Sequence, residues 1–134
     1  MKTLGVSRRF VTVLLTLFTM AAVIAVGLYA DSIYLWHAHA NHMATAEQFK
    51  RDFDERLPIG ASVADVERYL MTRHVEIVRP VPGPTDGPDY RVTVTRERSP
   101  YWFCGRGDVG LIVHFSAERQ VMKTEATWWS FDCL

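Results

Sequence analysis

Three closely spaced histidines, His37, His39 and His42, are the residues whose type and spacing first suggest chemistry. Imidazole binds divalent metals and changes its charge near neutral pH, so metal binding and pH sensing are the two roles to weigh. On a helix only His39 and His42, three positions apart, share a face, and His37 points elsewhere. The nearest carboxylates are Asp31 and Glu47, and no cysteine is close enough to complete a ligand set. The pattern favours a solvated connecting segment, with a metal site as the alternative.

Sequence motifs of enzymes are absent. There is no G-x-S-x-G, H-E-x-x-H, C-x-x-C or phosphate-binding glycine loop. Cys104 with His114 or His74 would serve as nucleophile and base only if a third group oriented the pair and the thiol stayed free. Three carboxylates fall in or beside expected turns, where such groups are usually solvated: Glu97, Asp108 and Glu118. No catalytic residue and no cofactor is therefore assigned, and the chain is not expected to be an enzyme.

Tryptophans are the better indication of function. Trp102, Trp128 and Trp129 lie in the last third of the chain. Neighbouring residues of a strand point to opposite faces, so Trp128 and Trp129 cannot both enter one core. An exposed tryptophan is a frequent anchor for a partner, because a large rigid ring buries much area at little entropic cost. The three are candidate partner-binding residues; packing on both faces of a sheet, or against a membrane surface, is the alternative.

These residues must be positioned by the elements around them, and the first element is an apolar stretch from Phe10 to Ala30. Its 21 residues carry no charge, and as a helix they would reach roughly 30 Å, the thickness of a bilayer's hydrocarbon core. Lys2, Arg8 and Arg9 precede it and Asp31 follows it. Because positive charge stays on the cytoplasmic side, we expect a cytoplasmic N-terminus and an external C-terminal part.

We predict an uncleaved signal anchor that crosses a bacterial inner membrane once, with a periplasmic C-terminal domain. The rival is a cleaved signal peptide, but the candidate cleavage point at 25–27 lies inside the apolar run and the one at 38–40 lies well beyond it. The expected parts are a cytoplasmic tail (1–9), a transmembrane helix (10–30), a juxtamembrane linker (31–44) and an extracytoplasmic domain (45–134).

The two cysteines, Cys104 and Cys133, fall in the part predicted to lie outside, where disulfides form and persist. In a hairpin closed by a turn at 116–119 they lie two positions out of register, an offset that one bulge or the turn at 105–107 can absorb. We therefore predict a disulfide, and the alternative is two buried reduced thiols.

Helical patterns come first in the expected domain. Phe49, Phe53 and Leu57 form an apolar stripe on a helix expected from Thr45, which has a capping-box glutamine three positions later, to Leu57. A second helix is expected after the N-cap Ser62 and ends near residue 72 or 73.

Strand patterns follow the helices. Alternation indicates a short strand at 75–79 and further strands at 89–95 and 120–131. The apolar run at 109–115 indicates a strand that is buried on both faces, and the prolines and glycines of 80–88 indicate a loop. In the strand from residue 89, Tyr90, Val92 and Val94 are expected on one face. A turn is expected at 105–108. The fold class is therefore α+β: an N-terminal transmembrane helix, then two helices packed on a three- to four-stranded antiparallel sheet.

The order of these elements, with Ile59-Gly60-Ala61-Ser62 between the helices and a meander ending in 111–116 (LIVHFS), resembles the SmpA/OmlA family. Members of that family are small accessory lipoproteins of the outer-membrane β-barrel assembly machinery, with two helices on a three-stranded sheet. The resemblance covers about residues 45–130 and implies the same fold. This chain lacks the lipidated cysteine and the Leu-Gly-x-Pro ending of the second helix, and it adds two cysteines.

The balance of charged residues limits the classes of partner that are expected. From Asn41 onward 12 Lys and Arg stand against 14 Asp and Glu, so nucleic acid is not expected. We expect a membrane-tethered interaction module, either an accessory subunit or an immunity-type binding protein, that is held to the membrane by Phe10–Ala30 and binds a protein of unknown identity. The alternative is an extracytoplasmic metal- or pH-sensing protein, or an enzyme, that uses the histidines.

Overall fold

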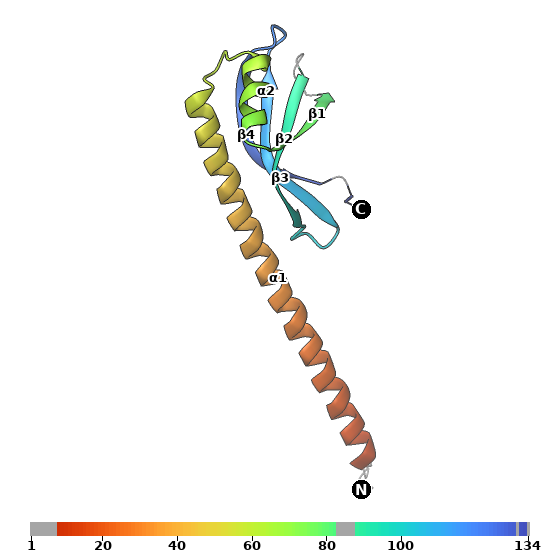
Figure 1. The fold of residues 1–134 in the computed structure, drawn as a ribbon. Helices are drawn as coiled ribbons and strands as arrows, with labels where there is room; N and C mark the ends of the chain where they lie inside the picture. Colours follow the sequence, from red (N-terminus) through yellow and green to blue (C-terminus); the bar gives the residue numbers. More distant parts are fainter. Residues whose placement is uncertain (1–7, 83–87, 131, 134) are drawn as a thin grey trace. The chain divides into compact units, whose positions relative to one another are not determined.

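The computed structural model describes residues 8–82, 88–130 and 132–133, which form two helices and four strands (Figure 1). This confirms the predicted α+β class. The chain divides after Leu35 into two compact units, and each is described by itself.

The first unit contains the apolar part of helix α1, which runs from Arg8 to Arg56. By length and composition this helix is sufficient to cross a membrane. The hydroxyls of Thr16 and Thr19 donate to the carbonyls of Thr12 and Leu15, at 2.9 and 3.0 Å. These two hydroxyls are thus satisfied within the helix, as a lipid environment requires.

Helix α1 continues without a break through residues 31–44, which the sequence had suggested as a linker. No proline or glycine occurs between Gly27 and Pro58, and alanines are frequent in this stretch, so nothing stops the helix. Thr45 is therefore a mid-helix residue, and its hydroxyl donates to the carbonyl of Asn41. The prediction that Thr45 caps a separate helix was wrong.

The second unit begins at Trp36 and holds the rest of α1, helix α2 (Val63–Thr72) and the sheet. The prediction for α2 is confirmed. Ser62 is its N-cap and accepts a hydrogen bond from the backbone N–H of Asp65 at 3.3 Å. The Ser62 hydroxyl in turn donates to the Asp65 carboxylate, which holds the pKa of Asp65 below its usual value.

The sheet is an antiparallel meander in the order β1-β2-β3-β4. Its strands are β1 (Glu76–Pro82), β2 (Pro88–Arg98), β3 (Arg106–Phe115) and β4 (Val121–Trp129). β1 ends at Pro82 and β2 begins at Pro88, so both strands reach into residues 80–88, the range predicted as a loop. Proline is tolerated there because β1 is an edge strand, with a register irregularity between Val78 and Val81. The centre of the predicted loop lies outside the described residues.

One face of the sheet is covered by α2 and by the C-terminal part of α1 (Figure 1). We call this the inner face. Its core joins one aromatic residue of α1 and three apolar residues of α2 to alternate residues of the strands: Phe53, Val63, Val66, Leu70, Tyr90, Val92, Leu111, Val113, Phe115 and Val121.

The opposite, outer face carries polar contacts. Thr93 donates to Asp108 at 3.1 Å, and Arg96 pairs with Glu76 at 2.5 Å. On the outer face of β3 Gly110 is buried but Ile112 is half-buried, so the prediction that β3 is buried on both faces holds for its inner positions and only in part for its outer ones.

Candidate functional site

Two of the predicted histidines meet a buried carboxylate inside the second unit. His39 Nδ1 lies 2.5 Å from Glu97 Oε1, and His42 Nδ1 lies 2.5 Å from Glu97 Oε2. The Glu97 side chain is 3% exposed, while those of His39 and His42 are 15% and 34% exposed. Both carboxylate oxygens are therefore used, and one buried group on β2 ties two turns of α1 to the sheet. We call these three residues the His–Glu cluster.

Glu97 reaches the inner face because β2 contains a bulge. Thr93 pairs with Gly110 and Thr95 pairs with the preceding residue, Val109, so Val94 is the extra residue. Before the bulge the inner positions are Tyr90 and Val92, and after it they are Thr95 and Glu97. The expected alternation is therefore correct only up to residue 93. Without the bulge Glu97 would face away from the helices.

Aromatic rings surround the His–Glu cluster. The Trp36 ring lies edge-on to His39 at 6.0 Å and to Tyr101 at 5.3 Å between ring centroids. Trp128 lies edge-on to His39 at 6.3 Å and packs against Tyr101 at 5.3 Å. Its indole lies directly over Gly107, where any Cβ would overlap the ring. The glycine makes room for Trp128, and the rings of Trp36 and Trp128 cover His39.

This arrangement fits hydrogen bonding rather than metal binding. With the proton on Nδ1, each imidazole donates to Glu97, so the nitrogens and oxygens that face one another are already used. Within residues 8–82, 88–130 and 132–133, no group of three or more His, Cys, Asp or Glu is arranged to hold a metal ion. His37 is exposed and is not part of the cluster. The expected segment of solvated histidines is thus replaced by two histidines that pack on the domain.

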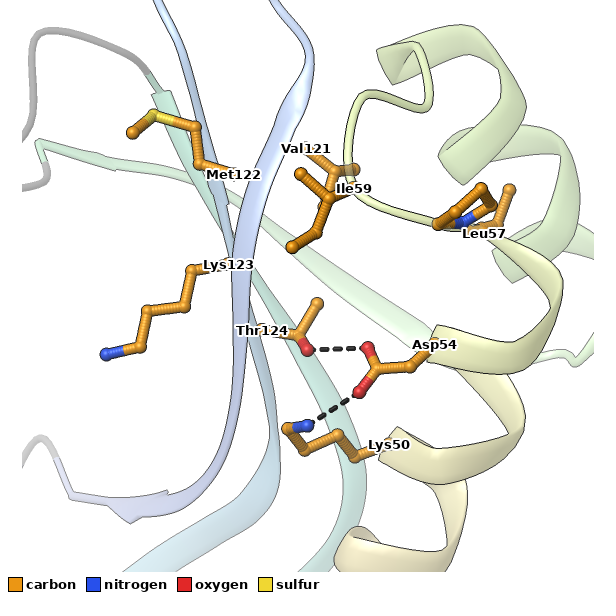
Figure 2. Close-up of a pocket in the computed structure, with 9 residues that line it drawn as sticks. Lys50, Asp54, Leu57, Ile59, Val121, Met122, Lys123 and Thr124 are labelled. Atoms are coloured by element: carbon orange, nitrogen blue, oxygen red, sulfur yellow. Dashed lines mark hydrogen bonds and ion pairs between the residues drawn. The ribbon is translucent and has the colours of Figure 1, made fainter.

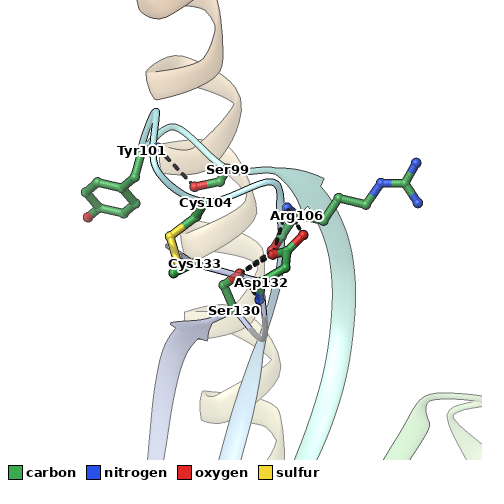
Figure 3. The surroundings of a disulfide bond; sticks show 7 residues. All are labelled: Ser99, Tyr101, Cys104, Arg106, Ser130, Asp132 and Cys133. Carbon is green, nitrogen blue, oxygen red and sulfur yellow. Dashed lines mark hydrogen bonds between the residues drawn. A yellow bond between two sulfur atoms is a disulfide. The ribbon is translucent and has the colours of Figure 1, made fainter.

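A disulfide joins Cys104 to Cys133, with Cα atoms 4.1 Å apart (Figure 3). The thiol is therefore not a nucleophile. The predicted offset of two positions is absorbed at the hairpin: Ser116 pairs with Gln120, and Met122 forms a bulge in β4. From the pair His114 and Lys123 back to the start of β3, the two strands keep one register. Extending this register beyond the strands places Cys104 opposite Cys133.

The C-terminal segment is held beside this disulfide. The Ser130 hydroxyl and the backbone N–H of Arg106 both donate to the Asp132 carboxylate, the hydroxyl at 2.7 Å and the N–H at 3.2 Å (Figure 3). These bonds hold the pKa of Asp132 below its usual value, the Ser130 hydroxyl being the larger cause. Arg106 already belongs to β3 and pairs with Arg98, so the turn expected at 105–108 is shorter than predicted.

The three candidate partner-binding tryptophans lie in three different environments. Trp129 is on the outer face, is 8% exposed, and has the Arg91 guanidinium 5.9 Å from its ring centre. Trp128 is on the inner face and half-buried, so the two rings do point to opposite faces as predicted. Trp102, on the loop before β3, is 92% exposed. Of the three, only Trp102 is largely exposed to solvent.

A groove of about 580 Å³ lies between the end of α1 and β4 (Figure 2). Asp54 lies at its floor, where its carboxylate accepts from Lys50 and from Thr124, each at 2.6 Å. Ile59, which is 79% exposed, points into the space between the helix and the strand, whereas Met122 points to the other side of β4 (Figure 2). The groove therefore combines an apolar rim with a charged floor beside an edge strand.

Two features of these sites were missed from the sequence. Glu97 was interpreted as a solvated carboxylate near a turn, because nothing in the alternation of β2 marks the bulge. The pair His39 and His42 was the available signal, since two histidines on one face of a helix need an acceptor if that face is covered. The groove follows from the packing of α1 against β4, which no local pattern specifies.

No family model, curated protein or solved structure matches the chain significantly. The resemblance to the SmpA/OmlA family therefore stays a prediction.

Proposed function

We propose that this chain is a single-pass protein of a bacterial inner membrane, with a cytoplasmic N-terminus and a periplasmic domain that binds a protein partner. The apolar helix α1 supports the anchoring. The basic residues before the span and Asp31 after it support the orientation. The paired cysteines agree with an oxidising compartment.

The observation that carries the binding role is the groove beside β4. This strand is at the edge of the sheet, and among the described strands only β3 pairs with it. At Val121 this edge is already occupied, because the backbone N–H and C=O of Val121 bond to Ala61 and Gly60 at 2.9 and 2.8 Å. Beyond Val121 an edge strand offers backbone N–H and C=O groups to an incoming strand. The groove lies directly next to that edge, so a bound segment would find both hydrogen bonds and side-chain contacts.

The occupant that fits is an extended segment of a partner protein, added to the sheet as a further strand. Alternate side chains of such a segment point to opposite faces. One set would enter the groove against Ile59 and Leu57, and the other would lie over Met122 on the far side of β4. Apolar residues at alternate positions of the partner match this surface. Ile59 and Met122 are exposed apolar residues that such a partner would bury.

The anchoring and orientation are tested by reporter fusions after residue 134. An alkaline phosphatase fusion should be active and a fluorescent reporter that folds only in the cytoplasm should be dark, with the N-terminal segment retained at full mass. The opposite pattern, or loss of the first thirty to forty residues, refutes the orientation or the uncleaved anchor.

The groove is tested by photo-crosslinking in intact cells. A photoreactive amino acid at position 122 should give one protein adduct, and Ile59→Arg should abolish that adduct without changing the amount of folded protein. Position 71 on α2 is the matched control, because Met71 is similarly exposed but is not among the residues that line the groove. Equal adducts at 122 and 71, or an adduct that survives Ile59→Arg, would exclude the groove as the binding site.

A further inference from the structure

The loop between β2 and β3, residues 99–105, holds two of its three aromatic residues, Trp102 and Phe103, exposed to solvent. We call it the aromatic loop. Trp102 is 92% exposed and Phe103 is 40% exposed, and their rings lie edge to face at 5.8 Å. The next residue, Cys104, is fixed by the disulfide. A large apolar surface that is held in solvent costs free energy and usually marks a site of contact.

Short-range bonds fix the conformation of the aromatic loop. The backbone N–H of Tyr101 donates to the Ser99 hydroxyl at 3.0 Å, and the N–H of Cys104 donates to the carbonyl of Tyr101 at 3.0 Å. At its base the N–H of Ser99 donates to the carbonyl of Gly105 at 3.2 Å. The Tyr101 ring packs on Trp36 and Trp128. The loop is therefore preorganised with the Trp102 ring outward, which lowers the entropic cost of contact.

Arginines line the base of the aromatic loop. Arg98 and Arg106 are directly paired across β2 and β3, and Arg96 lines the same hollow of about 820 Å³. Of the two carboxylates that line it, Glu97 is bound by His39 and His42, and Asp132 accepts from the Arg106 backbone and from Ser130. Arg96 is engaged by Glu76 and Asp108, so the guanidinium groups that lie exposed beside the aromatic loop are those of Arg98 and Arg106. Guanidinium groups bind phosphate oxygens in a bidentate manner.

We infer that the aromatic loop docks on the surface of an anionic phospholipid bilayer, with Trp102 and Phe103 in the interfacial region and Arg98 and Arg106 on lipid phosphates. Tryptophan favours this depth because its ring is apolar and its N–H is polar. Basic residues next to such rings add attraction to anionic headgroups.

Few residues separate the apolar stretch from the contact that holds the aromatic loop, so the membrane that anchors the chain is the bilayer surface within reach of this loop. The aromatic loop is attached through Tyr101 to Trp36, which follows Ala30, the last residue of the apolar stretch, by six positions. Six residues reach at most about 20 Å even when fully extended. This inference rests on the proposed membrane anchoring, but not on the groove beside β4.

The test uses the full chain in nanodiscs made of phosphatidylcholine and phosphatidylglycerol, with or without brominated phosphatidylcholine. Bromine quenches tryptophan on contact. The difference between wild type and Trp102→Phe isolates the emission of Trp102, since Phe retains an aromatic ring in the loop. We expect brominated lipid to quench this component at least twofold, and iodide in the buffer to quench it little. Trp129→Phe is the matched control, because the component of the buried Trp129 should be unaffected by brominated lipid.

A Trp102 component that is unaffected by brominated lipid and open to iodide would overturn the inference and leave a protein as the partner of this loop. Arg98→Gln with Arg106→Gln should weaken the lipid quenching in anionic discs but not in pure phosphatidylcholine. Equal quenching in both compositions, insensitive to the double variant, would overturn the assignment to anionic headgroups. Failure of the membrane anchoring itself is distinguishable, because the chain would then not co-purify with the nanodiscs at all.

Discussion

Glu97→Ala removes the acceptor that joins α1 to the sheet, and its effect can be worked from the contacts of the His–Glu cluster. The carboxylate accepts two imidazole N–H groups at 2.5 Å and is almost fully buried. A hydrogen bond to a charged group contributes about 1.5–3 kcal/mol. The bond to His42 counts for less because that side chain is one-third exposed. We therefore expect the free energy of unfolding to fall by about 2–4 kcal/mol.

Glu97→Gln separates charge from shape. The amide has the same size and can still meet both imidazoles, as acceptor to one and as donor to the other, but it carries no charge. The cost should therefore be roughly 1 kcal/mol, the difference between charged and neutral hydrogen bonds. Urea unfolding of the full chain in detergent micelles, followed by tryptophan fluorescence, measures both variants. Hydrogen exchange of the α1 backbone at residues 36–46 should also accelerate in Glu97→Ala.

Glu76→Ala is the matched control. Glu76 is likewise in contact with a nitrogen donor at 2.5 Å, the Arg96 guanidinium, but its side chain is 57% exposed and that of Arg96 is 64% exposed. Its loss should cost about 0–1 kcal/mol, as is usual for surface pairs. If Glu97→Ala costs no more than Glu76→Ala, burial does not strengthen the His–Glu cluster and the reasoning fails.

Three further changes test the packing of the domain. Replacing both cysteines by serine should lower the free energy of unfolding by roughly 3–4 kcal/mol, because the bond closes a long loop; an unchanged urea midpoint would contradict this. Trp129→Ala should cost about 3–5 kcal/mol and the exposed Trp102→Ala less than about 0.5, in the same assay; similar losses would show that Trp129 is not packed. Hydrogen bonds, first from the Ser130 hydroxyl and then from the Arg106 backbone, lower the pKa of Asp132 below its usual 3.8. The charged carboxylate therefore contributes fully to the free energy of unfolding above that pH, and this contribution is lost as the pH falls below it. Asp132→Asn should therefore flatten the decline of stability between about pH 4 and pH 2, and parallel curves would refute the assignment.

Local signals in the sequence were sufficient for most of the fold. Ser62 with Asp65 specified the start of α2, since an N-cap needs only nearby atoms. Alternation specified three of the strands, and the turn at 116–119 closed the hairpin as expected. The capping-box pattern at Thr45 failed because the same residues also fit a helix interior. There the threonine hydroxyl simply donates to the carbonyl four positions earlier.

The candidate sites were harder to predict because they depend on contacts between distant parts of the chain. His39 and His42 were correctly expected to share a helix face, but their partner Glu97 is more than fifty residues away. The exposure of each tryptophan also depends on contacts between residues that are distant in the sequence. Trp129 is buried on the face without helices, which alternation alone would have assigned to solvent, because it packs over Gly110 beneath Arg91.

Two of the three register irregularities between the described strands, those in β2 and β4, each make a specific long-range contact possible. The bulge at Val94 reverses the alternation of β2 and turns Glu97 toward the helices, so α1 gains a polar attachment that an unbulged strand would not provide. The bulge at Met122 shifts β4 by one position, and this shift brings Cys133 opposite Cys104 at the far end of the ladder. A one-residue slip in a strand normally exchanges its faces and is costly. Here each slip is matched by a contact that only the shifted register allows, the His–Glu cluster in one case and the disulfide in the other. The same two contacts hold the base of the aromatic loop, because Glu97 precedes it by two residues and Cys104 lies within it.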